Sequence, residues 1–136
     1  MADMFADLQG LGLSPQEFNK VAYHRSNLGN PYMDNEGRPV TIYSTGIEIP
    51  EGKYKGKFVS VPGYVNGQII QDENTLYKIW KNDIKSNKWP IYQTSEELNK
   101  RDQWLHQIMD KDVEGMVKRQ PYMPFESLFY EDSPLR

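Results

Sequence analysis

The chain has 136 residues, a length that suits a single domain, and a formal net charge of −3. It contains no cysteine, which excludes disulfides, thiol catalysis and thiolate-bound metal ions. Hydrophobic residues make up only 38% of the sequence, so we expect part of the chain to contribute little to a core. The negative charge gives no general attraction to nucleic acid or anionic lipid, although a local basic patch remains open.

The N-terminal segment, residues 1–12, is short, acidic and interrupted by glycines. It lacks the basic start of a signal peptide. No apolar run in the chain approaches the roughly 20 residues that a membrane helix needs. We therefore expect synthesis in a cytoplasm and no membrane span. We also expect residues 1–12 to form an N-terminal arm in which Phe5 contacts a partner.

The first regular element is predicted to be a short helix. Ser14 suits the N-cap, Pro15 suits the first helical position, and Glu17 completes a capping box with Ser14. The apolar side of this helix is expected to include Phe18 and Val21, and the helix is expected to end by residue 26. Residues 27–39 contain two glycines and two prolines and are predicted to form a loop.

The segment 34–71 alternates apolar and polar residues between frequent turn signals, which is typical of an antiparallel meander. We predict three or four strands, one running from Val40 toward Ile49 with an interruption and another over residues 58–61. The pair Asn66-Gly67 stands between two apolar runs. It predicts a type I′ hairpin, because that turn needs positive φ at both central residues.

A helix is predicted from Asp72, its N-cap, to about Ser86. Its apolar stripe is expected to contain four residues: Leu76, Ile79, Trp80 and Ile84. Residues 89–92 are predicted to form an extended connector, because Pro90 disfavours helix at the residue before it.

A second main helix is predicted to begin at Thr94, which forms a capping box with Glu97. It is expected to bury Leu98 and Leu105 and to reach residue 113 or 117. The sequence as a whole therefore predicts an α+β fold. We expect a small antiparallel β-meander with two main helices packed on it, a short N-terminal helix, and extended terminal arms.

The expected organisation is an N-terminal arm (1–12), an α+β domain (13–118) and an extended C-terminal tail (119–136). The tail is rich in apolar and aromatic residues, which a disordered tail usually lacks. We predict that these residues bind a neighbouring protein, with packing on their own domain as the open alternative. They are Tyr122, Met123, Phe125, Leu128, Phe129 and Tyr130.

Candidate chemistry in the sequence is sparse. Residues 34–36 are polar and precede Gly37, as in a fragment of a calcium loop, but the spacing of a full EF-hand is absent. We expect no metal ion and no cofactor. The carboxylate pairs Glu48 with Glu51 and Glu96 with Glu97 carry no catalytic motif, so we expect no enzyme. The alternative is a small cell-wall-glycan hydrolase, or an accessory domain of one, using two carboxylates.

A basic stretch offers a second alternative, a nucleic-acid-binding or host-inhibiting protein. Lys53, Lys55 and Lys57 would contact a nucleic-acid backbone while Tyr54 stacks on a base. A lysine-rich edge also guards a sheet against aggregation. We therefore rank nucleic acid below proteins as a partner.

Four pieces of the sequence share a recognisable order of turns and strands: Asp34–Thr45, Val59–Pro62, Asn66–Asp72 and Thr94–His106. Over residues 24–107 they resemble a small module that recurs in virion proteins of tailed bacteriophages, including internal and ejection proteins. None of them is a catalytic signature. The resemblance implies a bacteriophage structural protein, located in the virion and acting in assembly or DNA ejection. Its implied partners are other virion proteins, a second copy of itself included.

Overall fold

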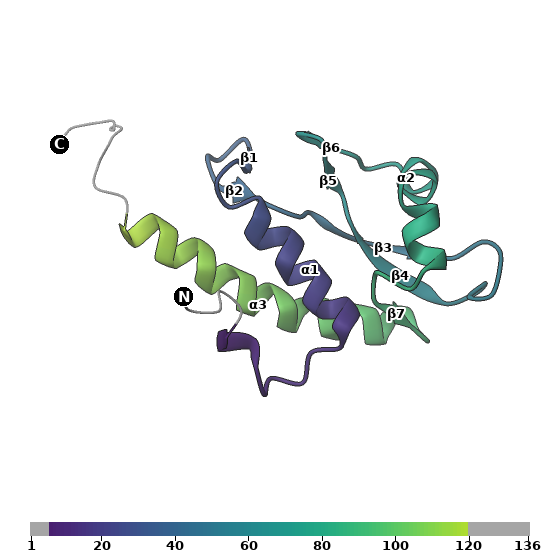
Figure 1. Ribbon diagram of the computed structural model, residues 1–136. Coiled ribbons are helices and arrows are strands. Elements are labelled where there is room, and N and C mark those ends of the chain that lie inside the picture. Colours follow the sequence, from purple (N-terminus) through teal and green to yellow (C-terminus); the bar gives the residue numbers. More distant parts are fainter. Residues whose placement is uncertain (1–5, 120–136) are drawn as a thin grey trace. The chain divides into compact units, whose positions relative to one another are not determined.

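The computed structural model describes residues 6–119, with side chains from residue 7 to residue 115. A 3₁₀ turn η1 (Ala6–Leu8) and helix α1 (Pro15–Ser26) come first. Six short strands follow: β1 (Tyr32–Met33), β2 (Pro39–Val40), β3 (Ser44–Glu48), β4 (Phe58–Pro62), β5 (Tyr64–Val65) and β6 (Gln68–Ile69). Helix α2 (Glu73–Lys85), strand β7 (Ile91–Tyr92) and helix α3 (Ser95–Arg119) complete the chain (Figure 1). The predicted α+β fold class is confirmed.

The chain divides into two compact units, residues 1–106 and residues 107–136. The first unit contains every strand of the described residues, both pockets discussed below and the start of α3. The described part of the second unit, residues 107–119, is the C-terminal part of α3. Within residues 6–119, no helix is long and apolar enough to cross a membrane.

The main sheet is antiparallel and has the strand order β3-β4-β7. Strand β4 lies in its centre and pairs with the full length of β3, from Ser44 opposite Pro62 to Glu48 opposite Phe58. Strand β7 was predicted only as an extended connector, and the structure shows that it is the third strand. Pro90 permits this because its carbonyl oxygen accepts a hydrogen bond from the Ser60 amide at 3.0 Å.

Two hairpins flank the main sheet. The predicted type I′ turn is confirmed between β5 and β6, where Asn66 has φ 51° and Gly67 has φ 81°. The prediction of a loop over residues 27–39 was wrong in its second half, because β1 pairs with β2 around a turn that runs from Asp34 to Gly37. The expected strand beyond Val40 is broken over residues 41–43 and resumes as β3.

The hydrophobic core lies between the main sheet and the helices. Its buried residues are Ile47, Ile49, Val59, Val61, Leu76, Ile84 and Trp89. The rings of Tyr23, Trp80 and Trp89 meet edge to face, with centroids 5.2–6.0 Å apart. Helix α2 buries Leu76 and Ile84 as predicted, but Ile79 is 41% exposed. The buried stripe follows positions 76, 80 and 84, and Ile79 lies off it.

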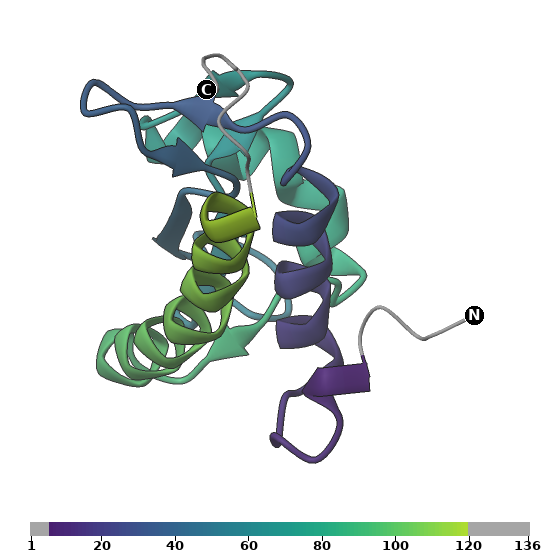
Figure 2. The ribbon, with the colours of Figure 1, turned by 90° about the vertical axis from the view of Figure 1, so that its left-hand side faces the viewer.

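The predicted capping box of α1 is complete, whereas the one predicted for α3 is only half formed. Ser14 and Glu17 form the full capping box of α1. At the start of α3, Thr94 accepts a hydrogen bond from the Glu97 amide, while the Glu97 carboxylate accepts one from the amide of Gln93. Figures 1 and 2 show α1 beside the N-terminal part of α3, and side chains 82 and 84 positions apart join the two helices there.

Candidate binding site

A cluster of buried polar side chains is the first candidate site. Lys20 on α1 is fully buried, and its Nζ forms an ion pair with Asp102 Oδ1 on α3 at 2.8 Å. The same ammonium donates to Ser60 Oγ on β4 at 2.5 Å and to Ser44 Oγ on β3. Ser60 and Ser44 also donate to the Asp102 carboxylate. Four elements are thus joined around one buried ion pair.

This cluster is poorly suited to catalysis. A serine nucleophile needs an adjacent base and access to substrate. Burial lowers the pKa of Lys20 and the carboxylate of Asp102 opposes this shift, and the Lys20 Nζ is already engaged by Asp102, Ser60 and Ser44. Ser60 is fully buried. Neither of the two pockets described below is lined by Lys20, Ser60 or Asp102. The cluster therefore links α1, β3, β4 and α3 within the fold.

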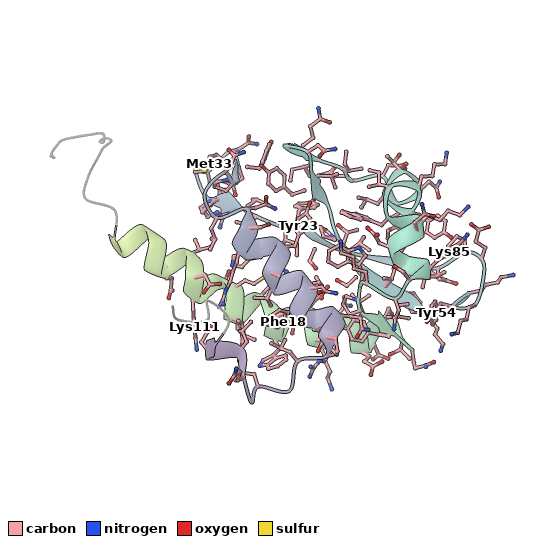
Figure 3. All side chains as sticks on the ribbon, viewed as in Figure 1. Phe18, Tyr23, Met33, Tyr54, Lys85 and Lys111 are labelled. Carbon is pink, nitrogen blue, oxygen red and sulfur yellow. The ribbon has the colours of Figure 1, made fainter. Side chains whose placement is uncertain are left out.

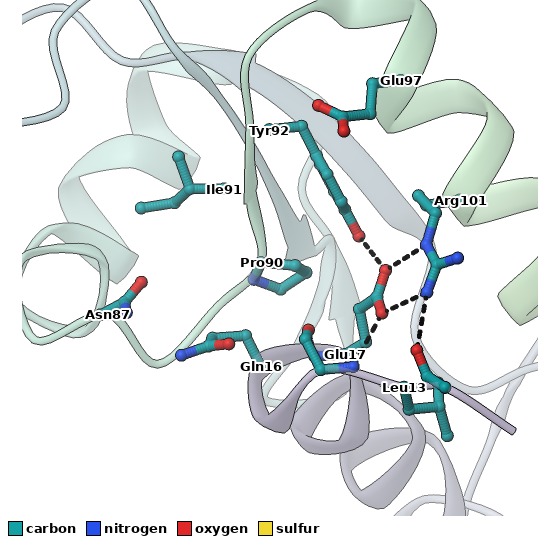
Figure 4. A pocket seen from close by; sticks show the side chains of 11 residues that line it. Leu13, Gln16, Glu17, Asn87, Pro90, Ile91, Tyr92, Glu97 and Arg101 are labelled. Atoms are coloured by element: carbon teal, nitrogen blue, oxygen red, sulfur yellow. Dashed lines mark hydrogen bonds and ion pairs between the residues drawn. The ribbon is translucent and has the colours of Figure 1, made fainter. Parts of the chain in front are cut away.

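A second network joins α1, β7 and α3 around the carboxylate of Glu17 (Figure 4). Glu17 Oε2 accepts from the Tyr92 hydroxyl at 2.7 Å and from Arg101 Nε at 2.8 Å, and Oε1 accepts from Arg101 Nη2 at 2.7 Å. Burial alone would raise the pKa of Glu17, but these donors and the Ser14 amide outweigh it and hold the pKa at about 2. Burial, together with the negative charge of Glu17, raises the pKa of Tyr92.

A pocket of about 590 Å³ opens beside this network, and Figure 4 shows Gln16, Asn87, Pro90 and Ile91 on its walls. Arg101 also reaches it, but its guanidinium already pairs with Glu17, donates to the Gly12 carbonyl and lies 4.5 Å from the ring centroid of Trp104. The charged groups that line this pocket are thus engaged within the fold, and the uncharged polar side chains on its walls include Gln16 and Asn87.

The strongest candidate is a second pocket, of about 460 Å³, which we name the tyrosine pocket. It is formed by the β1–β2 hairpin, the link between β2 and β3, and strand β6 with the residues after it. Its lining residues are Tyr32, Asp34, Val40, Tyr43, Ile69 and Gln71. Tyr32 and Tyr43 are each 39% exposed, and the adjacent Met33 is 54% exposed. A concave, aromatic surface with a few polar groups is the usual composition of a binding site.

Tyr43 is held in this pocket by an unusual backbone conformation. Its φ is 52°, in the left-handed region that non-glycine residues rarely adopt. Its carbonyl oxygen accepts hydrogen bonds from the Gly63 amide at 2.9 Å and from Thr45 Oγ1 at 3.1 Å. Its hydroxyl accepts from Gln71 Nε2 at 3.3 Å. The surrounding chain therefore fixes both the backbone and the ring of Tyr43.

The acidic member of the pocket, Asp34, orders the β1–β2 turn. Its Oδ1 accepts from the amides of Glu36 and Arg38 at 2.9 and 2.8 Å, and its Oδ2 accepts from Arg38 Nε at 3.3 Å. The hydrogen bond from the Arg38 amide, followed by these other contacts, lowers the pKa of Asp34, so the carboxylate is ionised at neutral pH. Among residues 6–119, no group of three histidine or acidic residues is placed to hold a metal ion.

The predicted nucleic-acid residues lie in the loop between β3 and β4. Tyr54 is half-buried against the core, and the ammonium groups of Lys53 and Lys57 lie 5.4 and 5.9 Å from its ring centroid. A ring in this position is already packed by its own fold. Figure 3 shows Tyr54 well apart from Met33, so this loop and the tyrosine pocket are separate surfaces.

The remaining predicted residues divide into two groups. Phe5 and the six tail residues Tyr122, Met123, Phe125, Leu128, Phe129 and Tyr130 lie outside the described residues. Of the carboxylate pairs, Glu51 accepts from the Tyr77 hydroxyl at 2.9 Å and pairs with Lys81 at 3.2 Å, and Glu48 is exposed on β3. Neither Glu48 nor Glu51 lines either pocket.

Sequence reasoning missed the tyrosine pocket, because the pocket depends on strand pairing. The turn from Asp34 to Gly37 has the residues of a type I turn at its ends, and this was the available signal for the β1–β2 hairpin. That hairpin places Tyr32 opposite Val40. The left-handed conformation of Tyr43 has no sequence signal, because turn propensities favour glycine or asparagine there.

Comparisons with protein-family models, with curated proteins and with solved structures give no match.

Proposed function

We propose that this chain is a non-enzymatic binding protein that holds a protein partner at the tyrosine pocket. Tyr43 is the observation that carries this proposal. Left-handed backbone costs an L-residue roughly 1–2 kcal/mol. Here that cost falls on a large aromatic residue that stays 39% exposed. Backbone strain of this kind persists where the surrounding structure enforces it, and it concentrates at functional sites.

The surface around Tyr43 has the composition of a protein interface. Tyrosine and methionine are enriched at interfaces, because they offer a large apolar area and, for tyrosine, a polar group at its edge. Tyr32, Met33 and Tyr43 account for three of the five large hydrophobic residues that are exposed among those described. They occur within twelve residues of sequence, and Tyr32 and Tyr43 line one pocket, with Met33 next to Tyr32 on β1.

The non-enzymatic part of the proposal is supported by the burial of the side chains that could take part in catalysis. Lys20, Ser60 and Glu17 are each enclosed and hydrogen-bonded to neighbouring side chains. The resemblance to a module of tailed-phage virion proteins supports a location in the virion. We propose a structural role in the virion, with neighbouring virion subunits as partners and the terminal segments 1–12 and 119–136 as additional contacts.

Photo-crosslinking in assembled particles tests this proposal. A photoreactive phenylalanine analogue replaces Met33, which is 54% exposed and follows the pocket residue Tyr32 on β1, and the particles are purified and irradiated. The matched control places the same analogue at Ile79, which is 41% exposed on α2. We expect the chain in the particles by mass spectrometry and a crosslinked virion protein from position 33 but not from position 79. Particles that lack the chain, or equal crosslinking from both positions, would contradict the proposal.

A further inference from the structure

We infer that the tyrosine pocket receives residues 118–124 of a second copy of this chain, the sequence KRQPYMP. The protein then associates with itself, the pocket of one copy holding the tail of another. The inference rests on the proposed function, because it names the partner of the same pocket. Three observations lead to it: the aromatic lining of the pocket, its size, and the charges on the two sides.

The first observation is the match between an aromatic pocket and a proline-containing sequence. Pro121 and Pro124 have the spacing P-x-x-P, and Lys118 stands three residues before the first proline. Segments of this kind favour the polyproline II conformation, which loses little entropy on binding, and they dock in grooves lined by aromatic side chains. Tyr32 and Tyr43 supply such a lining, with Val40 beside them.

Polar groups of the pocket suit the backbone of such a segment. Polyproline II backbone has no internal hydrogen bonds, so its carbonyl oxygens stay available to donors on the partner. The exposed amide of Gln71 lies at the pocket and already donates to the Tyr43 hydroxyl at 3.3 Å, which fixes its position. Gln71 is therefore placed to hydrogen-bond an incoming carbonyl oxygen.

The second observation is size. A pocket of about 460 Å³ accepts a few side chains and is too small to receive a folded surface. A short extended segment fits such a space. The segment begins in the last residues of α3, which ends at Arg119, and its two prolines belong to the aromatic tail that the sequence predicts to bind a neighbour.

The third observation is charge. The carboxylate of Asp34 lines the pocket, and that of Glu36 lies in the adjoining β1–β2 turn. The guanidinium of Arg38 supplies one positive charge beside these two negative charges. The pKa of Asp34 is lowered by its hydrogen bonds, so this turn keeps a negative charge at neutral pH. Lys118 and Arg119 bring two positive charges next to the proline segment. Complementary charges of this kind fix the direction in which the segment lies.

Sedimentation velocity of the full-length chain over a range of concentrations tests the inference. We expect the wild type to self-associate. Tyr32→Ala, which removes part of the aromatic lining of the pocket, and the double change Pro121→Ala with Pro124→Ala should each remain monomeric. A mixture of these two variants should associate again, because each keeps the part that the other lacks. Ile79→Ala and Ser133→Ala serve as controls and should associate like the wild type.

A second pocket variant, chosen to keep the fold, separates loss of binding from misfolding. Asp34→Asn retains an Oδ1 acceptor for the two turn amides but removes the charge. We expect its self-association constant to fall several-fold and to depend less on salt concentration.

Three outcomes would overturn the inference: a wild type that is monomeric at every concentration, self-association of Tyr32→Ala that equals the wild type, or no recovery in the mixture. If the wild type is monomeric but position 33 still crosslinks to a different virion protein, this inference fails and the proposed function stands.

Discussion

Gly63 approaches Tyr43 so closely that a Cβ atom on Gly63 would lie 2.7 Å from the Tyr43 carbonyl oxygen and 2.8 Å from its Cδ1 atom. The Gly63 amide also donates to that carbonyl oxygen at 2.9 Å. The backbone after β4 therefore supports the backbone before β3 directly, without a side chain between them. This contact holds Tyr43 in its left-handed conformation at the pocket.

Replacing Gly63 with alanine should disturb this contact. The added methyl group meets backbone as well as the ring, so the chain must shift to accommodate it. We expect Gly63→Ala to lower the free energy of unfolding by about 1–3 kcal/mol, as overpacked sites do. Urea denaturation measures this loss, and crosslinking from position 33 should fall in parallel. Gly29→Ala is the control, because a Cβ atom there meets nothing within 4 Å and should leave stability nearly unchanged.

Tyr43→Asn should separate stability from binding. Asparagine adopts left-handed backbone more readily than tyrosine, so the substitution relieves strain while it removes the ring. We expect the free energy of unfolding to stay the same or to rise by up to about 1 kcal/mol, a trade typical of functional sites. Partner binding at the pocket should be lost. A variant that is clearly less stable, or that still binds, would show that the ring serves the fold.

The fold should lose stability in acid through Glu17. Its pKa is about 2 in the folded state, below the ordinary value of 4.5. The resulting stabilisation, about 3 kcal/mol, is complete above the ordinary pKa and is lost as the pH falls from about 5 toward 2. Glu17→Gln should therefore unfold more easily at pH 7 and depend less on pH in this range. Arg101→Gln, which removes the main donor, should move the acid loss of stability to higher pH. Thermal melts across this range measure both effects.

Lys20 and Asp102 should behave as a coupled pair. Lys20→Met removes the ammonium and leaves the Asp102 carboxylate with only its serine partners, so we expect a loss of about 3 kcal/mol. Adding Asp102→Asn should recover part of it, because the amide no longer carries an unpaired charge. A double-mutant cycle by chemical denaturation measures the coupling. Purely additive losses would contradict the pairing.

Local signals in the sequence predict the helices and one hairpin well. The Ser14–Glu17 capping box and the Asn66-Gly67 turn depend on a few adjacent residues, and both are confirmed. Strand β7 was not predicted, because its pairing with β4 depends on the buried position of Trp89 beside it. The local sequence around Pro90 gives no sign of this pairing.

The buried polar face of α1 was missed for a related reason. Helical periodicity places Phe18 and Val21 toward the core, and Val21 is indeed fully buried. Glu17, Lys20 and His24 are buried as well. A charged residue is normally assigned to solvent, and only a partner distant in sequence reverses that assignment. For Lys20 that partner is Asp102, 82 positions later in the chain.

The pairs Lys20–Asp102 and Glu17–Arg101 affect the order of folding during synthesis. Helix α1 leaves the ribosome early, but the groups that neutralise Lys20 and Glu17 lie on α3 and follow only 82 and 84 residues later. Until then, docking α1 on the sheet would bury Lys20 and Glu17 without the α3 side chains that pair with them in the folded state. We therefore expect α1 to dock late during synthesis, once the start of α3 has emerged.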